Sequence, residues 1–123
     1  MITNAKRISK EIAPTLLWSN ANPSASFAPQ VLTFDGEYSG FLVEVRSTTS
    51  DATTAVIYLP VGQGYVDTFA TRKSGNGQGW RLVNSVNAGS IDFGNGIRTS
   101  SSGSSTNNSY AIPVNIWGVV VGI

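Results

Sequence analysis

Apolar and polar residues alternate with a period of two from Leu16 onward, and this pattern constrains the fold more than any other feature. Successive side chains of a β-strand point to opposite faces of a sheet, so the alternation is typical of strands with one buried face. In the segment 40–47, Phe41, Val43 and Val45 fall on one face, and the residues between them fall on the other. The main part of the chain is therefore predicted to be all-β.

Turns rich in Gly, Pro, Asn and Ser separate short strands along this part of the chain. The run 55–59 is apolar on both faces, which predicts a strand in the middle of a sheet. The segment 94–96, Gly-Asn-Gly, predicts a hairpin turn, and the Ser-, Thr-, Gly- and Asn-only segment 99–109 predicts an exposed flexible loop. We expect strands over residues 16–19, 27–34, 40–47, 54–61, 65–69, 80–86, 90–93, 97–99 and 110–123. Residues 15–123 thus predict one domain with a β-sandwich or jelly-roll-like fold.

Residues 1–14 form a separate N-terminal arm in this interpretation. Ile8 and Ile12 lie four residues apart, on one face of a short helix that Pro14 would end. So small an apolar stripe does not hold a helix together in water, so the arm is either a helix docked on another surface or an extended segment. Its positive charges suit electrostatic docking or, alternatively, a solvated terminal face. The predicted docking residues are Lys6, Arg7, Ile8 and Ile12.

The composition argues against catalysis. The sequence has no His and no Cys, which excludes thiolate nucleophiles, disulfides and a histidine general base. Its seven carboxylates fall mostly at turns or at outward strand positions, so we predict that the protein is not an enzyme and holds no metal or cofactor. A net charge of +1 gives no reason to expect a nucleic-acid partner. No apolar run is long enough to span a bilayer, and no secretory signal opens the sequence, which predicts synthesis in a cytoplasm.

Carbohydrate is the ligand class that the sequence favours. Protein sites for sugars combine an aromatic face with planar amides and charged groups. Six residues on two neighbouring segments offer that combination: Trp80, Gln78, Asn76, Arg81, Tyr65 and Gln63. In the alternative interpretation, Trp80 and Tyr65 belong to the core or to a subunit interface. Trp18 and Trp117, which lie within apolar strands, are expected in the core.

Three stretches of the sequence carry a resemblance to a known family. They are LLWSNANPSASFAPQ at 16–30, IDFGNG at 91–96, and NNSYAIPVNIWG at 107–118. In order and spacing they resemble a family of short structural proteins of tailed bacteriophages, especially phages of Gram-positive hosts. The family offers no catalytic or binding residues to carry over. The apolar residues 119–123, after the third stretch, depart from the usual ending.

The resemblance implies a virion protein made in the cytoplasm of a bacterial host. The first expectation is a tail-tip, fibre or baseplate component that binds host-surface glycans. The second is a capsid decoration or head-fibre protein that docks on the shell through the N-terminal arm, and the third is a lectin-like module outside any phage. Virion appendages are commonly symmetric oligomers, among which trimers are frequent, so we expect a homotrimer in contact with other virion proteins. Its predicted interface consists of Trp117, Val119, Val121 and Ile123.

Overall fold

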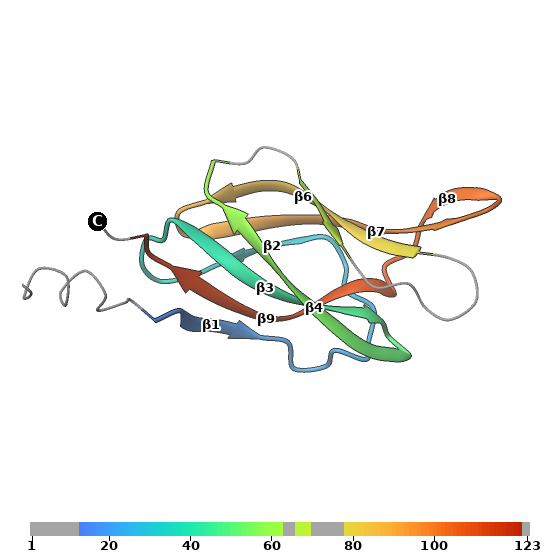
Figure 1. Cartoon of the computed structure of the whole chain (residues 1–123), viewed down its shortest axis with the longest axis horizontal. Coiled ribbons are helices and arrows are strands. Elements are labelled where there is room, and N and C mark those ends of the chain that lie inside the picture. Colours follow the sequence, from blue (N-terminus) through green and yellow to red (C-terminus); the bar gives the residue numbers. More distant parts are fainter. Residues whose placement is uncertain (1–12, 63–65, 70–77, 122–123) are drawn as a thin grey trace, which may run out of the picture.

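A computed structural model describes residues 13–62, 66–69 and 78–121 of the chain, and for residues 66–69 it describes the backbone alone. Every regular element within these residues is a β-strand, so the prediction of an all-β chain is confirmed there (Figure 1). The N-terminal arm up to Ile12 lies outside the described residues. The strands are β1 (Thr15–Ser19), β2 (Gln30–Thr33), β3 (Gly40–Thr48), β4 (Asp51–Pro60), β5 (Val66–Phe69), β6 (Gln78–Asn87), β7 (Ser90–Ser100), β8 (Gly103–Thr106) and β9 (Tyr110–Val119).

The strands form two antiparallel sheets. The first sheet has the order β1-β9-β3-β4, and the second has the order β2-β7-β6-β5, with β8 paired to the far part of β7 (Figure 1). The sheets contact each other through β3 and β9 on one side and β6 and β7 on the other. The chain passes between sheets repeatedly, because β2 belongs to the second sheet while β1 and β3 belong to the first.

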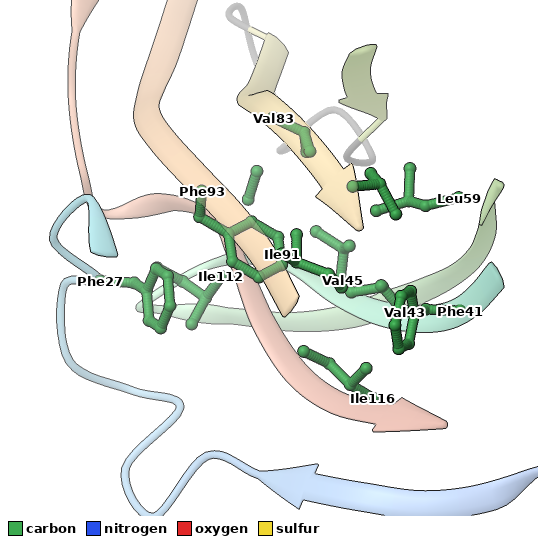
Figure 2. Packing of buried hydrophobic residues seen from close by; sticks show 12 residues of the cluster. Phe27, Phe41, Val43, Val45, Leu59, Val83, Ile91, Phe93, Ile112 and Ile116 are labelled. Carbon is green, nitrogen blue, oxygen red and sulfur yellow. The ribbon is translucent and has the colours of Figure 1, made fainter. Parts of the chain in front are cut away.

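The core lies between the two sheets. Phe41, Val43 and Val45 on β3 are buried there, as their alternation predicts. Phe27, from the segment before β2, packs edge-on against Phe93 of β7 with ring centroids 5.7 Å apart. Burying an aliphatic or aromatic side chain of this size stabilises a fold by roughly 1.5–3 kcal/mol. The other buried apolar residues, most of them seen in Figure 2, are Leu59, Val83, Val86, Ile91, Ala111, Ile112 and Ile116.

The position predicted for β4 is wrong. This strand pairs with β3 at the edge of the described sheet and does not lie in its middle. Leu59 points into the core, but Val56 and Tyr58 are 55% and 45% exposed on the opposite face. The strand is apolar on both faces because its outward residues continue an apolar surface that runs across the whole sheet.

The hairpin predicted at Gly94-Asn95-Gly96 is also wrong. Strand β7 runs through these residues without a break, and the turn before it lies at Ala88 and Gly89. A Cβ atom on Gly96 would lie 2.6 Å from the carbonyl oxygen of Asn107 and 2.8 Å from that of Tyr110. The glycine is required because the chain crosses closely over β7 at this point.

Part of the loop predicted over 99–109 is a second hairpin. Strand β7 continues to Ser100, and β8 folds back onto it with Ile97 opposite Thr106. The residues of β8 are all exposed. A Ser- and Thr-rich sequence forms a strand here because its backbone pairs with the protruding end of β7, seen at the right of Figure 1.

Candidate functional site

Trp80 lies on the outer face of the second sheet, near the end that carries β8. It is half-buried, and its Nε1 atom donates a hydrogen bond of 3.0 Å to Oγ1 of Thr99 on β7. Oγ1 of Thr99 lies 2.9 Å from Oγ of Ser104 on β8, and Gln78 is directly opposite Thr99 in the register. We call Gln78, Trp80, Thr99 and Ser104 the Trp80 platform. An indole N–H is only a donor, so the hydroxyl of Thr99 holds the ring in one orientation.

Arg81 does not belong to this surface, and its predicted role in sugar binding is corrected. Neighbouring residues of a strand point to opposite faces, so Arg81 enters the space between the sheets and its side chain is 0% exposed. Its Nε donates to the carbonyl of Ala111 at 2.7 Å. Nη1 and Nη2 donate to the carbonyls of Gly94 and Tyr110, each at 2.9 Å. The guanidinium thereby joins β6 and β7 to β9.

The surroundings of Arg81 explain how a cation is tolerated in the interior. Its guanidinium carbon lies 5.1 Å from the ring centroid of Phe27, a cation–π contact, and Asn108 accepts further bonds from the same group. Desolvation by burial lowers the pKa of Arg81 from its ordinary value to about 10, so the side chain stays charged at neutral pH. Arg81 is a structural residue that fixes the spacing of the two sheets.

The remaining predicted sugar-binding residues, Asn76, Tyr65 and Gln63, lie outside the described residues. The backbone of β5 places Phe69 opposite Trp80, so β5 borders the Trp80 platform on the side away from β7. Of the six predicted residues, the structure thus brings Trp80 and Gln78 together on one face and removes Arg81 from it. The sequence does not point to Thr99 and Ser104, because the composition of 99–109 predicts a flexible loop.

A second surface of interest is the outer face of the first sheet. In the register, Leu16 lies opposite Trp117, Trp117 opposite Leu42, and Leu42 opposite Tyr58, so one apolar row crosses all four strands. Val56 lies on the same face, two residues from Tyr58. We call these five residues the outer apolar face. A shallow open groove on it is lined by Pro14, Leu42, Val56 and Trp117.

The expectation that Trp117 lies in the core is wrong. It is half-buried, and it faces outward because its neighbour Ile116 fills the core from β9. Trp18 does pack against the core, with its ring centroid 6.0 Å from that of Phe27. Within the predicted trimer interface, Val119 is half-buried and Val121 is 66% exposed, whereas Ile123 lies outside the described residues. Assembly into a trimer stays a prediction.

Neither a metal centre nor a membrane helix is found in the part of the chain that the structure describes. Over these residues, His, Cys, Asp and Glu side chains do not gather in threes or more as metal ligands would. None of the described segments forms a helix of the length and hydropathy needed to cross a bilayer. Comparison with protein-family models, with curated proteins and with solved structures found no match.

Proposed function

We propose that this chain is a structural component of a tailed-phage virion, at the tail tip, fibre or baseplate, and that it binds host-surface carbohydrate. The observation that carries the proposal is the Trp80 platform, where an indole ring is held by Thr99 beside an exposed amide. The apolar face of a sugar ring stacks on an indole, and its hydroxyls take hydrogen bonds from amides and hydroxyls. Gln78 and Ser104 supply such groups next to Trp80.

Because the indole ring of Trp80 is oriented before a sugar arrives, the affinity for carbohydrate is expected to be higher. A side chain that is already fixed loses little conformational entropy when a ligand arrives. The bond from Trp80 to Thr99 and the pairing of β8 onto β7 both restrict the platform in the free protein. The resemblance of residues 16–30, 91–96 and 107–118 to phage structural proteins supports the virion part of the proposal.

The finer fold assignment belongs to the same proposal. We assign the two sheets to a β-sandwich of jelly-roll-like topology. The nested pairing of β1 with β9 and of β2 with β7 supports it. The hairpins β3–β4 and β6–β7, which each stay within one sheet, depart from a strict alternation between sheets.

Binding of purified protein to host cell-wall polysaccharide, measured by titration calorimetry and on a glycan array, tests the proposal. We expect Trp80→Ala to abolish binding and Gln78→Ala to weaken it. Trp117→Ala, which removes a half-buried tryptophan from the other sheet, is the matched control and leaves binding unchanged. Equal binding by the wild-type protein and Trp80→Ala would refute the carbohydrate site.

A second candidate, a capsid decoration or head-fibre protein, is favoured by the apolar and cationic residues of the N-terminal arm, which suit docking on another protein. In that role the arm residues Lys6, Arg7, Ile8 and Ile12, outside the described residues, would attach the domain to the shell. Immunogold labelling of intact particles separates the two candidates. Label on the tail tip supports the first, and label over the capsid supports the second.

A further inference from the structure

The outer apolar face is unusual for an antiparallel sheet, because such sheets normally turn polar residues toward water. Leu16 is 55% exposed at one edge of the sheet, and Val56 and Tyr58 are similarly exposed at the other. Trp117 and Leu42 form the half-buried floor between them. A row of large apolar side chains across a whole sheet marks a surface that another segment or molecule covers.

Gly40 allows the ring of Tyr58 to lie flat on the outer apolar face. A Cβ atom on Gly40 would overlap the ring of Tyr58, so the absence of a side chain at residue 40 lets the tyrosine lie along the sheet. Tyr58 thereby extends the apolar row from Leu42 to the edge of β4. The face is a broad strip and not a deep pocket, which suits a chain segment better than a small molecule.

The chain itself leads onto this strip. Pro14 comes directly before β1, and it is one wall of the groove whose other walls are Leu42, Val56 and Trp117. The residues before Pro14 therefore start at the rim of the groove. A tethered segment competes well against free partners, because its effective concentration is on the order of millimolar.

The segment 1–12 is long enough to cross the strip. Four strands spaced about 4.8 Å apart give a face about 14 Å across between its outermost strands. Twelve residues reach about 18 Å as a helix, and farther when extended, so the segment 1–12 spans the distance from β1 to β4. Its sequence also fits, since Ile8 and Ile12 are apolar and Lys6, Arg7 and Lys10 are cationic.

A carboxylate lies on the same face, where it can pair with a cation of the segment. Glu44 lies on the same face, directly opposite Val56, and is half-buried. Its Oε1 accepts a hydrogen bond of 2.9 Å from Nδ2 of Asn115, which fixes the carboxylate beside the apolar row. A cation from the segment 1–12 would meet this carboxylate when the two isoleucines cover the row.

We infer that residues 1–12 fold back within the same chain and cover the outer apolar face, with Ile8 and Ile12 against Trp117, Leu42 and Val56. This inference goes beyond carbohydrate binding and does not depend on it, because the Trp80 platform lies on the other sheet. The occupant of the strip is the chain's own segment and not a second copy or another virion protein.

Paramagnetic relaxation measured by NMR on the full chain tests the inference. The sequence contains no Cys, so Ser9→Cys takes a nitroxide label at one position only. We expect the label to remove most of the amide signal intensity of Leu42 and Val56. The amide of Val31, a valine of matched exposure on the second sheet, keeps its intensity. Undiminished signals at Leu42 and Val56 would overturn the inference.

Two further samples identify the occupant. Combining Ser9→Cys with Ile8→Asp and Ile12→Asp restores the signals, whereas combining it with Thr3→Asp leaves them weakened. In an equal mixture of isotope-labelled chains without nitroxide and unlabelled chains with nitroxide, no loss of intensity is expected. Loss in this mixture would show that a neighbouring copy supplies the segment, and the inference would then be wrong.

Discussion

The two sheets present different outer faces. On the first sheet, Leu16, Val56 and Tyr58 are exposed on one apolar strip, whereas on the second sheet Val31 stands alone among exposed large apolar side chains whose burial is described. The Trp80 platform on the second sheet is instead built from hydroxyls, an amide and one indole. An alternating strand pattern therefore shows where a core lies, and a failure of that pattern on an outer face shows where a further contact is required.

The largest expected change in stability tests whether Arg81 lies in the interior and not on the Trp80 platform. Arg81→Met should lower the free energy of unfolding by about 3 kcal/mol or more, because two buried carbonyl oxygens and one partly buried carbonyl oxygen lose their donors. Urea denaturation followed by tryptophan fluorescence measures this change. Arg98→Met, which removes one bond to the hydroxyl of Tyr110, is the milder control. A loss below about 1 kcal/mol would place Arg81 on the surface after all.

The next prediction contrasts two valines of equal exposure, Val56 at 55% and Val31 at 56%. If residues 1–12 cover the first sheet, Val56→Ser should destabilise the full chain by about 1.5 kcal/mol, because the valine is then buried. Val31→Ser should change stability by no more than about 0.5 kcal/mol. Urea midpoints provide the comparison. Equal effects at the two positions would remove the distinction between the two outer faces.

The orientation of Trp80 can be tested through its partner. Thr99→Val keeps the shape of the side chain but removes the acceptor of the indole N–H, so we expect a loss of about 1 kcal/mol in stability. Carbohydrate binding should weaken in the same variant. Thr99→Ser, which retains the hydroxyl, should behave like the wild-type protein. A Thr99→Val protein with unchanged binding would show that the hydrogen bond does not prepare the platform.

The smallest effect expected is electrostatic. Glu44→Gln keeps the hydrogen bond with Asn115 but removes the negative charge. If residues 1–12 cover the first sheet, this charge faces their cations, so stability should fall by about 0.3 kcal/mol. Because salt screens such pairs, wild type and variant should have the same stability in about 1 M NaCl. Urea midpoints of the wild type and of Glu44→Gln, each measured at low and at high salt, test this prediction. A difference that persists at high salt would argue against an ion pair.

The sequence predicts the inner part of the fold well. Alternation at Phe41, Val43 and Val45 places β3 correctly, because side chains that point to one face of a strand enter one core. Sequence-based predictions are wrong where the same residue type occurs for two different structural reasons. Asn-Gly at 95–96 favours a turn by its conformational freedom, but here Gly96 makes room for a crossing chain. No local pattern distinguishes these two uses, because the crossing segment lies more than ten residues away.

The candidate site is less predictable than the core. Trp80 and Gln78 were found because an aromatic ring and an amide two residues apart share a face of a strand. Arg81 was misassigned because a charged residue is normally solvated, and only the carbonyls of Gly94, Tyr110 and Ala111 make its burial favourable. The outer apolar face contributes to the doubly apolar run 55–59, but such a run predicts a buried central strand as readily as an edge strand with an apolar outer face.

The position of β9 has a consequence for synthesis of the chain. This strand follows the other eight described strands in the sequence, yet it lies between β1 and β3. The side chain of Ser19 donates a hydrogen bond to that of Asn115 across 96 residues. A ribosome must therefore deliver almost the whole sequence before the first sheet can close, and such distant pairings fold slowly. A product of interrupted translation would expose two unpaired strand edges, and these favour aggregation. Only chains translated through β9 can complete the first sheet.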